Sequence, residues 1–157
     1  MPPTVRIVRP DSPELWDAAR RLVEEYASSL HLDLGFQDFD QEIASLSREY
    51  GPPAGAFLLA ERDGAFLGCV ALRKWEDGCE MKRLYVRPEG RGLGIGRLLA
   101  EAIVDEARRL GYKTMRLDTL PSMREAQGLY AALGFRPVAP YRYNPVPGTT
   151  FMELKLR

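Results

Sequence analysis

The 157-residue sequence has little of what several common classes of protein depend on. Its two cysteines, Cys69 and Cys79, have neither a metal-binding spacing nor a disulfide framework, so we expect both to be small buried side chains in a reducing compartment. His31 is the single histidine and has no partner motif. Because no second histidine exists to share a metal ion, we expect no metal site.

Long apolar runs and a net charge are absent as well. No segment approaches the roughly 18 apolar residues of a membrane-spanning helix, and the start, MPPTVRIVRP, has no basic leader followed by an apolar run. The 22 basic residues balance 22 acidic ones, so the chain as a whole lacks the electrostatic signature of a nucleic-acid or membrane partner. We expect a soluble, cytoplasmic protein that binds neither.

Three familiar motifs are missing. There is no G-x-S-x-G for a serine hydrolase and no G-x-x-x-x-G-K-[ST] for a P-loop. The dinucleotide pattern G-x-G-x-x-G fails from Gly92, where its last position is Arg97, and from Gly94, where it is Leu99. A nucleotide-binding domain therefore stays an alternative, although the sequence contains neither of these nucleotide-binding motifs.

The composition suits a single domain. With 45% hydrophobic residues and no visible linker, residues 1–157 can bury one core. Tight hairpin turns are predicted at Asp63-Gly64 and Asp77-Gly78. The expected strands cover residues 4–9, 57–62, 66–73, 80–86, 113–120 and 150–156, and the expected helices cover 12–30, 38–50, 95–110 and 122–134.

The stretch from Glu80 to Gly111 carries most of the functional information. It predicts a strand, a loop over residues 87–94 and a helix that Gly111 ends as a left-handed cap. The helix is indicated by apolar residues at helical spacing, namely Ile95, Leu98, Leu99, Ala102, Ile103, Ala107 and Leu110.

An anion is expected at the start of this helix. Arg91 and Arg97 flank the N-terminus, where unpaired N–H groups make a nearby cation unfavourable by about 0.3–1 kcal/mol unless an anion is bound. Glycines at positions 92, 94 and 96 leave the backbone open to phosphate oxygens. A solvated basic face is the alternative for the local cluster of Lys82, Arg83, Arg87, Arg91 and Arg97.

Two motifs in this order resemble those of the GNAT superfamily of N-acetyltransferases. Arg91-x-x-Gly94-x-Gly96 after a strand resembles the R/Q-x-x-G-x-G/A loop that holds the pyrophosphate of acetyl-CoA, and AxxLYxxLGF over residues 126–135 is similar to a second family element. The resemblance covers about residues 55–136 and implies an α/β (α+β) fold. Its sheet would be mixed, mostly antiparallel and twisted, with about six to seven strands flanked by about four helices.

The resemblance implies acetyl-CoA as co-substrate, bound by residues of the strand, the loop and the next two helices. One departure from the family pattern is Met123, where GNAT sequences often have an asparagine that contacts the coenzyme; Ser122 or the nearby backbone is the expected substitute. The implied set is Leu84, Tyr85, Val86, Arg91, Gly92, Leu93, Gly94, Ile95, Gly96, Arg97, Ser122 and Tyr130.

Acetyl transfer to an amine requires a base, an oxyanion site and an acid. The resemblance implies Glu80 as the base, directly or through a water, provided that partial burial raises its pKa; a structural glutamate paired with an arginine is the alternative. Tyr130 would protonate the departing thiolate, with a buried core aromatic as the alternative.

The resemblance also gives a role to main-chain N–H groups. Those of Leu84 and Val86 would bind the thioester carbonyl and the pantetheine arm of the coenzyme. This requires the 80–86 and 113–120 strands to splay, as a bulge near Leu84 would allow.

The acceptor is expected to be a primary amine of a small, amino-acid-like molecule, acetylated by direct attack in a ternary complex. Phe36, Gln37, Arg142 and Tyr143 lie where the family places this site, and Arg142 could hold a carboxylate bidentately or be a surface arginine stacked on aromatics. A peptide or protein N-terminus and a non-catalytic acyl-CoA sensor are the alternatives. The sequence leaves open whether the protein is a monomer or a homodimer.

Overall fold

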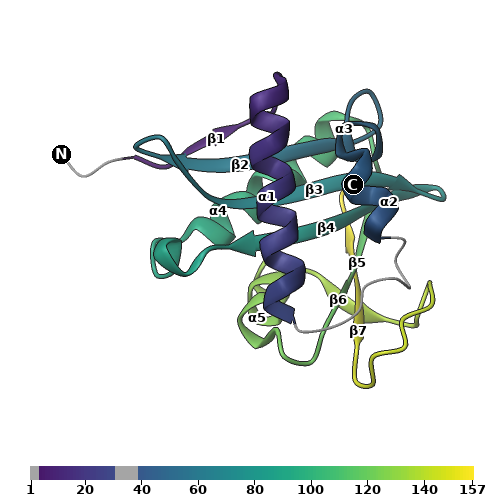
Figure 1. Ribbon diagram of the computed structural model, residues 1–157. Helices are drawn as coiled ribbons and strands as arrows, with labels where there is room; N and C mark the ends of the chain where they lie inside the picture. The colour runs from purple at the N-terminus through teal and green to yellow at the C-terminus, as the bar shows by residue number, and fades with distance from the viewer. Residues whose placement is uncertain (1–3, 31–38) are drawn as a thin grey trace.

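The computed structural model describes residues 4–30 and 39–157 and contains one seven-stranded sheet in the order β1-β2-β3-β4-β5-β7-β6 (Figure 1). Neighbouring strands are antiparallel except β4 and β5, which are parallel. The elements are β1 (Arg6–Val8), α1 (Pro13–Leu30), α2 (Phe39–Ala44), α3 (Leu46–Tyr50), β2 (Ala56–Arg62), β3 (Ala65–Trp75), β4 (Gly78–Val86), a 3₁₀ turn (Pro88–Gly90), α4 (Ile95–Arg109), β5 (Thr114–Thr119), α5 (Arg124–Ala132), β6 (Arg136–Val138) and β7 (Thr150–Lys155).

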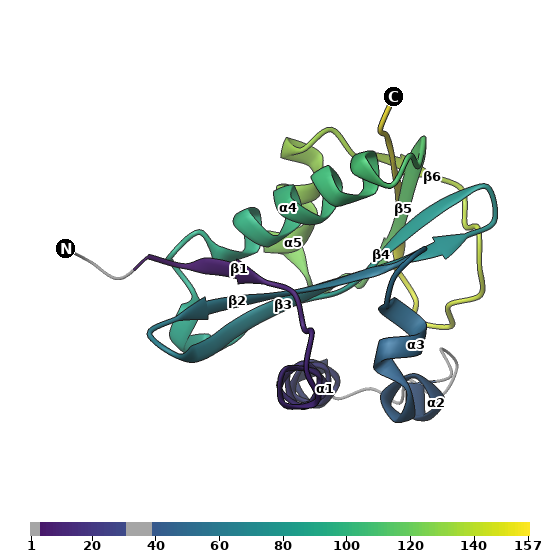
Figure 2. The ribbon, with the colours of Figure 1, turned by 90° about the horizontal axis from the view of Figure 1, so that it is seen from above.

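The sheet is covered on both faces (Figure 2). Helices α1, α2 and α3 lie on one face, and α4 and α5 lie on the other. Each face has its own apolar cluster: Leu22, Val23 and Tyr50 are buried on the α1 side, and Leu99 and Ile103 are buried on the α4 side. The mixed fold that the sequence predicted is therefore confirmed.

Local sequence signals explain how several elements begin and turn. At the start of α1, Ser12 Oγ accepts a hydrogen bond from the Leu15 amide (3.2 Å), as a helix N-cap does. The β2–β3 turn has positive φ angles at Asp63 and Gly64 (52° and 79°), as predicted. In the next hairpin the positive φ falls on Glu76 instead, and Gly78 already belongs to β4.

Two elements differ from the prediction. The expected helix over residues 38–50 is two short helices, α2 and α3, which separate at Ser45, where the side-chain Oγ bonds back to the Gln41 carbonyl (3.1 Å). Strand β6 was not predicted, because its three residues, one of them proline, have no usable periodicity. It forms an edge strand that pairs with β7.

The feature that creates space for a site is the divergence of β4 and β5. The two strands pair only at Cys79–Met115 and Glu80–Arg116 and separate beyond that point. On its other side β4 carries a bulge, because the register with β3 passes from Ala71–Lys82 to Cys69–Tyr85. Arg83, inside the bulge, has a φ of 62°, a strained value for a residue with a side chain. The predicted splay and the bulge near Leu84 are both confirmed.

Among the helices that the structure describes, none combines the length and the apolar character needed to cross a membrane.

Candidate active site

A cleft of about 750 Å³ lies where the end of β4, the start of α4 and the start of α5 meet. It contains the predicted coenzyme residues except Leu93, whose side chain is exposed, and Tyr130, which lines an adjoining cavity. Met123, at the position where asparagine is common, also lines the cleft. The predicted residues found there are Leu84, Tyr85, Val86, Arg91, Gly92, Gly94, Ile95, Gly96, Arg97 and Ser122.

The first turn of α4 presents unpaired amides to this cleft. The first backbone bond of the helix runs from the Leu98 N–H to the Gly94 carbonyl (3.1 Å), so the amides before Leu98 have no partner within the helix. Gly92 and Gly94 have φ angles of 81° and 75°, which only glycine adopts readily, and the first turn contains no acidic residue. Such a helix start is suited to a bound anion.

Gly96 also lines the cleft, although its position would tolerate a small side chain. A Cβ atom on Gly96 would lie 3.7 Å from Val86 and 3.9 Å from Leu129, between β4 and α5. These are ordinary contact distances, so glycine is not needed for folding at this point. A longer side chain would fill the cleft. The residues present therefore fit a diphosphate held by the backbone.

A second, smaller cavity lies at the β4–β5 splay and adjoins the cleft. Tyr26, Leu30, Leu84 and Met123 line both spaces. The polar residues that reach the smaller cavity include Lys82, Asp118, Tyr130 and Asn144. Groups from β4, β5, α5 and the loop before β7 thus converge on one point.

Tyr130 keeps its proton in this environment. The residue is 6% exposed, and its ring lies 5.7 Å from that of Phe135. Burial, helped by the nearby carboxylate of Asp118, raises the pKa of its phenol well above the ordinary value of 10. A protonated hydroxyl beside the cavity can donate to an anion formed there.

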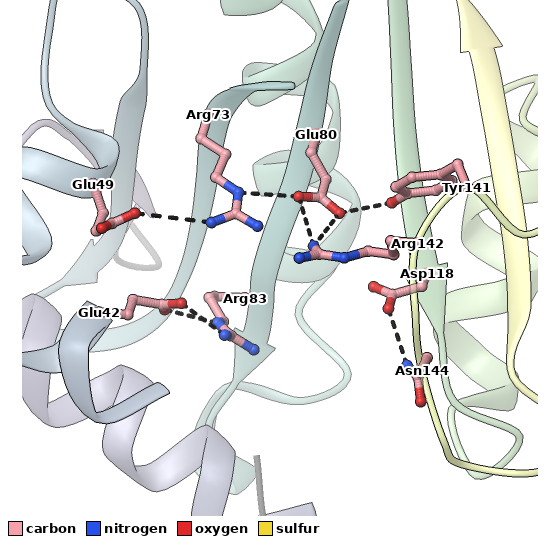
Figure 3. Close-up of polar contacts among 9 residues, drawn as sticks. All are labelled: Glu42, Glu49, Arg73, Glu80, Arg83, Asp118, Tyr141, Arg142 and Asn144. Carbon is pink, nitrogen blue, oxygen red and sulfur yellow. Dashed lines mark hydrogen bonds and ion pairs between the residues drawn. The ribbon is translucent and has the colours of Figure 1, made fainter. Parts of the chain in front are cut away.

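Glu80 lies in a buried ion cluster beside the cavity (Figure 3). Its carboxylate has no exposed surface and accepts hydrogen bonds from Arg73 Nε (3.0 Å) and the Tyr141 hydroxyl (2.7 Å). Arg142 Nη1 lies 3.0 and 2.8 Å from the two carboxylate oxygens. The guanidinium of Arg142 also lies 4.7 Å from the ring centre of Trp75. The cluster thus connects the loop before β7 to strands β3 and β4.

The pKa of Glu80 does not meet the condition on which its predicted role as a base depended. Burial alone would raise this pKa, but the charges of Lys82, Arg142 and Arg73 and the hydrogen bond from Tyr141 outweigh burial and lower it below 4.5. Both oxygens are also occupied by donors. This geometry favours the alternative role, a structural carboxylate paired with arginines.

We therefore expect Glu80→Gln to lower the free energy of unfolding at pH 7 by about 3 kcal/mol, because two partly buried arginines, Arg73 and Arg142, lose their counter-ion. A carboxylate whose pKa is lowered by folding stabilises the protein above pH 4.5, and this contribution is lost as the pH falls through the folded-state pKa. Urea denaturation should show wild type and variant converging below pH 4.5.

A suitable control is Glu61→Gln, which removes a surface pair with Arg6 and should cost less than about 1 kcal/mol. Equal stability of wild type and Glu80→Gln at pH 7, combined with a large loss of turnover, would instead favour Glu80 as the base.

Asp118 and Lys82 were not predicted as site residues. Asp118 Oδ2 accepts a hydrogen bond from Asn144 Nδ2 (3.0 Å), and Oδ1 has no hydrogen bond from any residue within 4–30 and 39–157 (Figure 3). Both residues are charged positions within largely buried strands. Charged residues inside predicted strands could have been noticed in the sequence. The splay of β4 and β5 explains why a charge is tolerated at these two positions.

The structure does not bring the predicted acceptor residues together at one site. Arg142 faces Glu80, and Tyr143 is 72% exposed. Phe36 and Gln37 lie outside the described residues. Within residues 4–30 and 39–157, no group of three or more histidine, cysteine, aspartate or glutamate side chains is arranged to hold a metal ion.

Comparison with known proteins identifies the family of this chain. The model of the acetyltransferase (GNAT) family matches residues 16–135. A protein named as an uncharacterized N-acetyltransferase of Schizosaccharomyces pombe is 42% identical over 99% of this chain and 97% of its own length. An IAA acetyltransferase of Azospirillum brasilense is 36% identical over 98% of this chain and 99% of its own length.

The fold has counterparts among solved structures. A GNAT-family acetyltransferase of Staphylococcus aureus superposes with a TM-score of 0.79 at 18% identity, covering 98% of this chain and all of that one (100%). With the family match and the 42% identical relative, this places the chain in the GNAT family. The protein is a GNAT-type N-acetyltransferase.

Proposed function

We propose that the protein moves the acetyl group of acetyl-CoA to the amine of a small acceptor while both are bound, with Tyr130 as the acid and Asp118 as the proton acceptor. The observation that carries this proposal is the junction of the glycine-rich cleft with the cavity that Asp118 and Tyr130 line. A coenzyme in the cleft can thus present its sulfur end to titratable groups at the splay.

The start of α4 is proposed to hold the diphosphate. The unpaired amides before Leu98 point out of the helix, and Arg91 and Arg97 line the same cleft. Main-chain N–H groups of Leu84 and Val86 are proposed to bind the thioester carbonyl and the pantetheine arm. Beyond Glu80, β4 has no pairing with β5, which supports this role.

The proposed proton transfers use the two sides of the cavity. The bound thioester supplies an electrophilic acetyl carbon. Asp118 takes one proton from the acceptor ammonium, and the freed nitrogen lone pair forms the C–N bond. The C–S bond then breaks, and Tyr130 gives its proton to the departing sulfur. The nitrogen loses its second proton, which restores the Tyr130 phenol, and Asp118 releases the first proton to solvent. The products are the N-acetyl amine, coenzyme A and one proton.

Asp118 suits the role of proton acceptor better than Glu80 does. Only one of its oxygens accepts a hydrogen bond from another described side chain, whereas both oxygens of Glu80 do. Asp118 also lines the cavity that Tyr130 lines. A small acceptor is proposed because this cavity holds only about 30 Å³. The names of the relatives do not agree on one acceptor.

The function is tested by measuring coenzyme A release from acetyl-CoA with a panel of amino acids, their carboxamides, aliphatic diamines and short peptides. We expect amine-dependent release with a small acceptor, lowered about 100-fold or more in Asp118→Asn with acetyl-CoA affinity unchanged. Release with peptides alone would move the acceptor class to a polypeptide N-terminus. Tight acetyl-CoA binding without release for any amine would favour a sensor and contradict the proposal.

A further inference from the structure

Lys82 is a buried cation without a direct ion pair in the described part of the chain, although the charges of Glu80 and Asp118 act on it from nearby. The residue is 5% exposed, and its side chain lines the cavity at the β4–β5 splay. Among the residues that the structure describes, no hydrogen bond or ion pair to this ammonium is found. Burying a charge without a partner is costly, so such a group is normally matched by a counter-ion.

The neighbouring charges are already engaged elsewhere. Glu80 accepts its hydrogen bonds from Arg73, Tyr141 and Arg142, and Arg83 is paired with Glu42 through two contacts of 2.8 and 2.7 Å (Figure 3). Asp118 is held by Asn144 and makes no ion pair with Lys82 among the described contacts. The cavity is thus left with one cation and one anion that do not satisfy each other.

The electrostatic surroundings agree with this geometry. Burial and the adjacent charge of Arg83 lower the pKa of Lys82 to about 8, although Glu80 and Asp118 act in the opposite direction and Arg142 adds to the lowering. The ammonium form still predominates at neutral pH. A bound anion would stabilise the ammonium form of Lys82 and so raise its pKa again.

We propose that Lys82 binds a carboxylate of the acceptor, so that the substrate is an amino acid, whose amine lies toward Asp118 and Tyr130. This inference rests on the proposed function and narrows its acceptor class. An amino acid carries a cation and an anion on one small molecule and therefore complements the two charges of the cavity. Because the cavity itself holds only about 30 Å³, the rest of the substrate would lie in the adjoining cleft. Lys82 here takes the role that the sequence suggested for Arg142, because the Nη1 atom of Arg142 is already bound to Glu80.

The kinetic test compares each L-amino acid with its own carboxamide as acceptor. In wild type we expect the free acid to have the lower KM. In Lys82→Met the KM of the acid should rise about 10- to 100-fold, the usual value of a charge-assisted hydrogen bond, while the KM of the carboxamide stays within about twofold. Methionine has a similar length and no charge to bury, so this variant is expected to fold with unchanged or higher stability.

Lys74→Met is the matched control, because Lys74 is exposed on β3 and lines neither the cleft nor the cavity. It should leave both KM values unchanged. A loss of turnover with acid and carboxamide alike in Lys82→Met would overturn the proposal and point to a lysine that takes part in proton transfer.

A second measurement does not depend on turnover. In protein labelled with ¹⁵N-lysine and saturated with coenzyme A, the Nζ resonance of Lys82, assigned through its absence in Lys82→Met, is followed while a mixture of the standard L-amino acids is added. We expect this resonance to shift with the amino acids and not with their carboxamides. No response to either mixture would refute carboxylate binding, whereas a response without any acetyl transfer would refute the proposed function alone.

Discussion

Tyr130→Phe should lower kcat by about 100- to 10,000-fold, the usual contribution of a positioned general acid, while the Kd for acetyl-CoA changes by less than about threefold. The phenol is the group that can protonate the departing sulfur, because burial keeps it in its protonated form at neutral pH. Removing one oxygen preserves the ring and its contact with Phe135. The measurement is steady-state coenzyme A release together with calorimetric binding of acetyl-CoA.

Tyr112→Phe is the matched control. Its hydroxyl donates to the Ala54 carbonyl (2.5 Å), away from the cleft and the cavity, so the same atom is removed without touching the site. We expect kcat to stay within about threefold of wild type, since a single neutral hydrogen bond contributes about 1 kcal/mol to stability and nothing to catalysis here. An unaltered kcat in Tyr130→Phe would leave Tyr130 as a core aromatic.

Gly96→Leu should raise the Kd for acetyl-CoA about 100-fold or more. The new side chain would occupy the space between Val86 and Leu129, and losing two amide contacts to a charged diphosphate costs about 1.5–3 kcal/mol each. The variant should still fold, because Gly96 lies in α4 without a positive φ and leucine is the better helix former by nearly 1 kcal/mol. Gly94 is less suitable, since its φ of 75° would strain any other residue.

Gly128→Leu provides the control for this change. Gly128 lies in α5, has open space where its Cβ would be, and does not line the cleft. Its replacement introduces the same side chain into a helix of the same face of the sheet. We expect an unchanged Kd in Gly128→Leu. A Kd for Gly96→Leu equal to that of Gly128→Leu would mean that the diphosphate is not held at the start of α4.

Much of the fold could be predicted because its signals are local. Four residues of the predicted helical stripe, Ile95, Leu99, Ile103 and Ala107, are buried by α4. Leu98 was predicted on the same face but is exposed, and Ala100, Val104 and Glu106 are buried although they lie outside the stripe. The glycines around Gly94 mark the start of the helix, and the resemblance of the two motifs to the family predicted the order of the remaining elements along the chain. The splay of β4 and β5 followed from the chemistry that the resemblance implied, and the bulge at Arg83 and the short β4–β5 pairing agree with it.

The surroundings of Glu80 could not be predicted, because they depend on contacts across the chain. Tyr141 and Arg142 lie 61 and 62 residues further along, and the sequence gives no sign that their loop returns to β4. A glutamate at the start of a strand is compatible with a base or with an ion pair. Only the four donor contacts, and the lowered pKa that accompanies them, favour the second role.

The residues now proposed for the acceptor site could not be predicted for the same reason. Lys82 and Asp118 are 36 positions apart in the chain and come together through the parallel pairing of β4 with β5. Viewed singly, each is a polar residue in a strand. At the splay they line one cavity with opposite charges, which is why the proposed substrate class is argued from the structure and not from the motifs.

A crystal structure with coenzyme A and an amino acid bound would test the arrangement of the site most directly. We expect the diphosphate within hydrogen-bond distance of the amides between Gly92 and Arg97, the sulfur beside the Tyr130 hydroxyl, and the acceptor carboxylate on Lys82. A diphosphate bound elsewhere, or a sulfur directed away from the β4–β5 splay, would contradict the proposed chemistry.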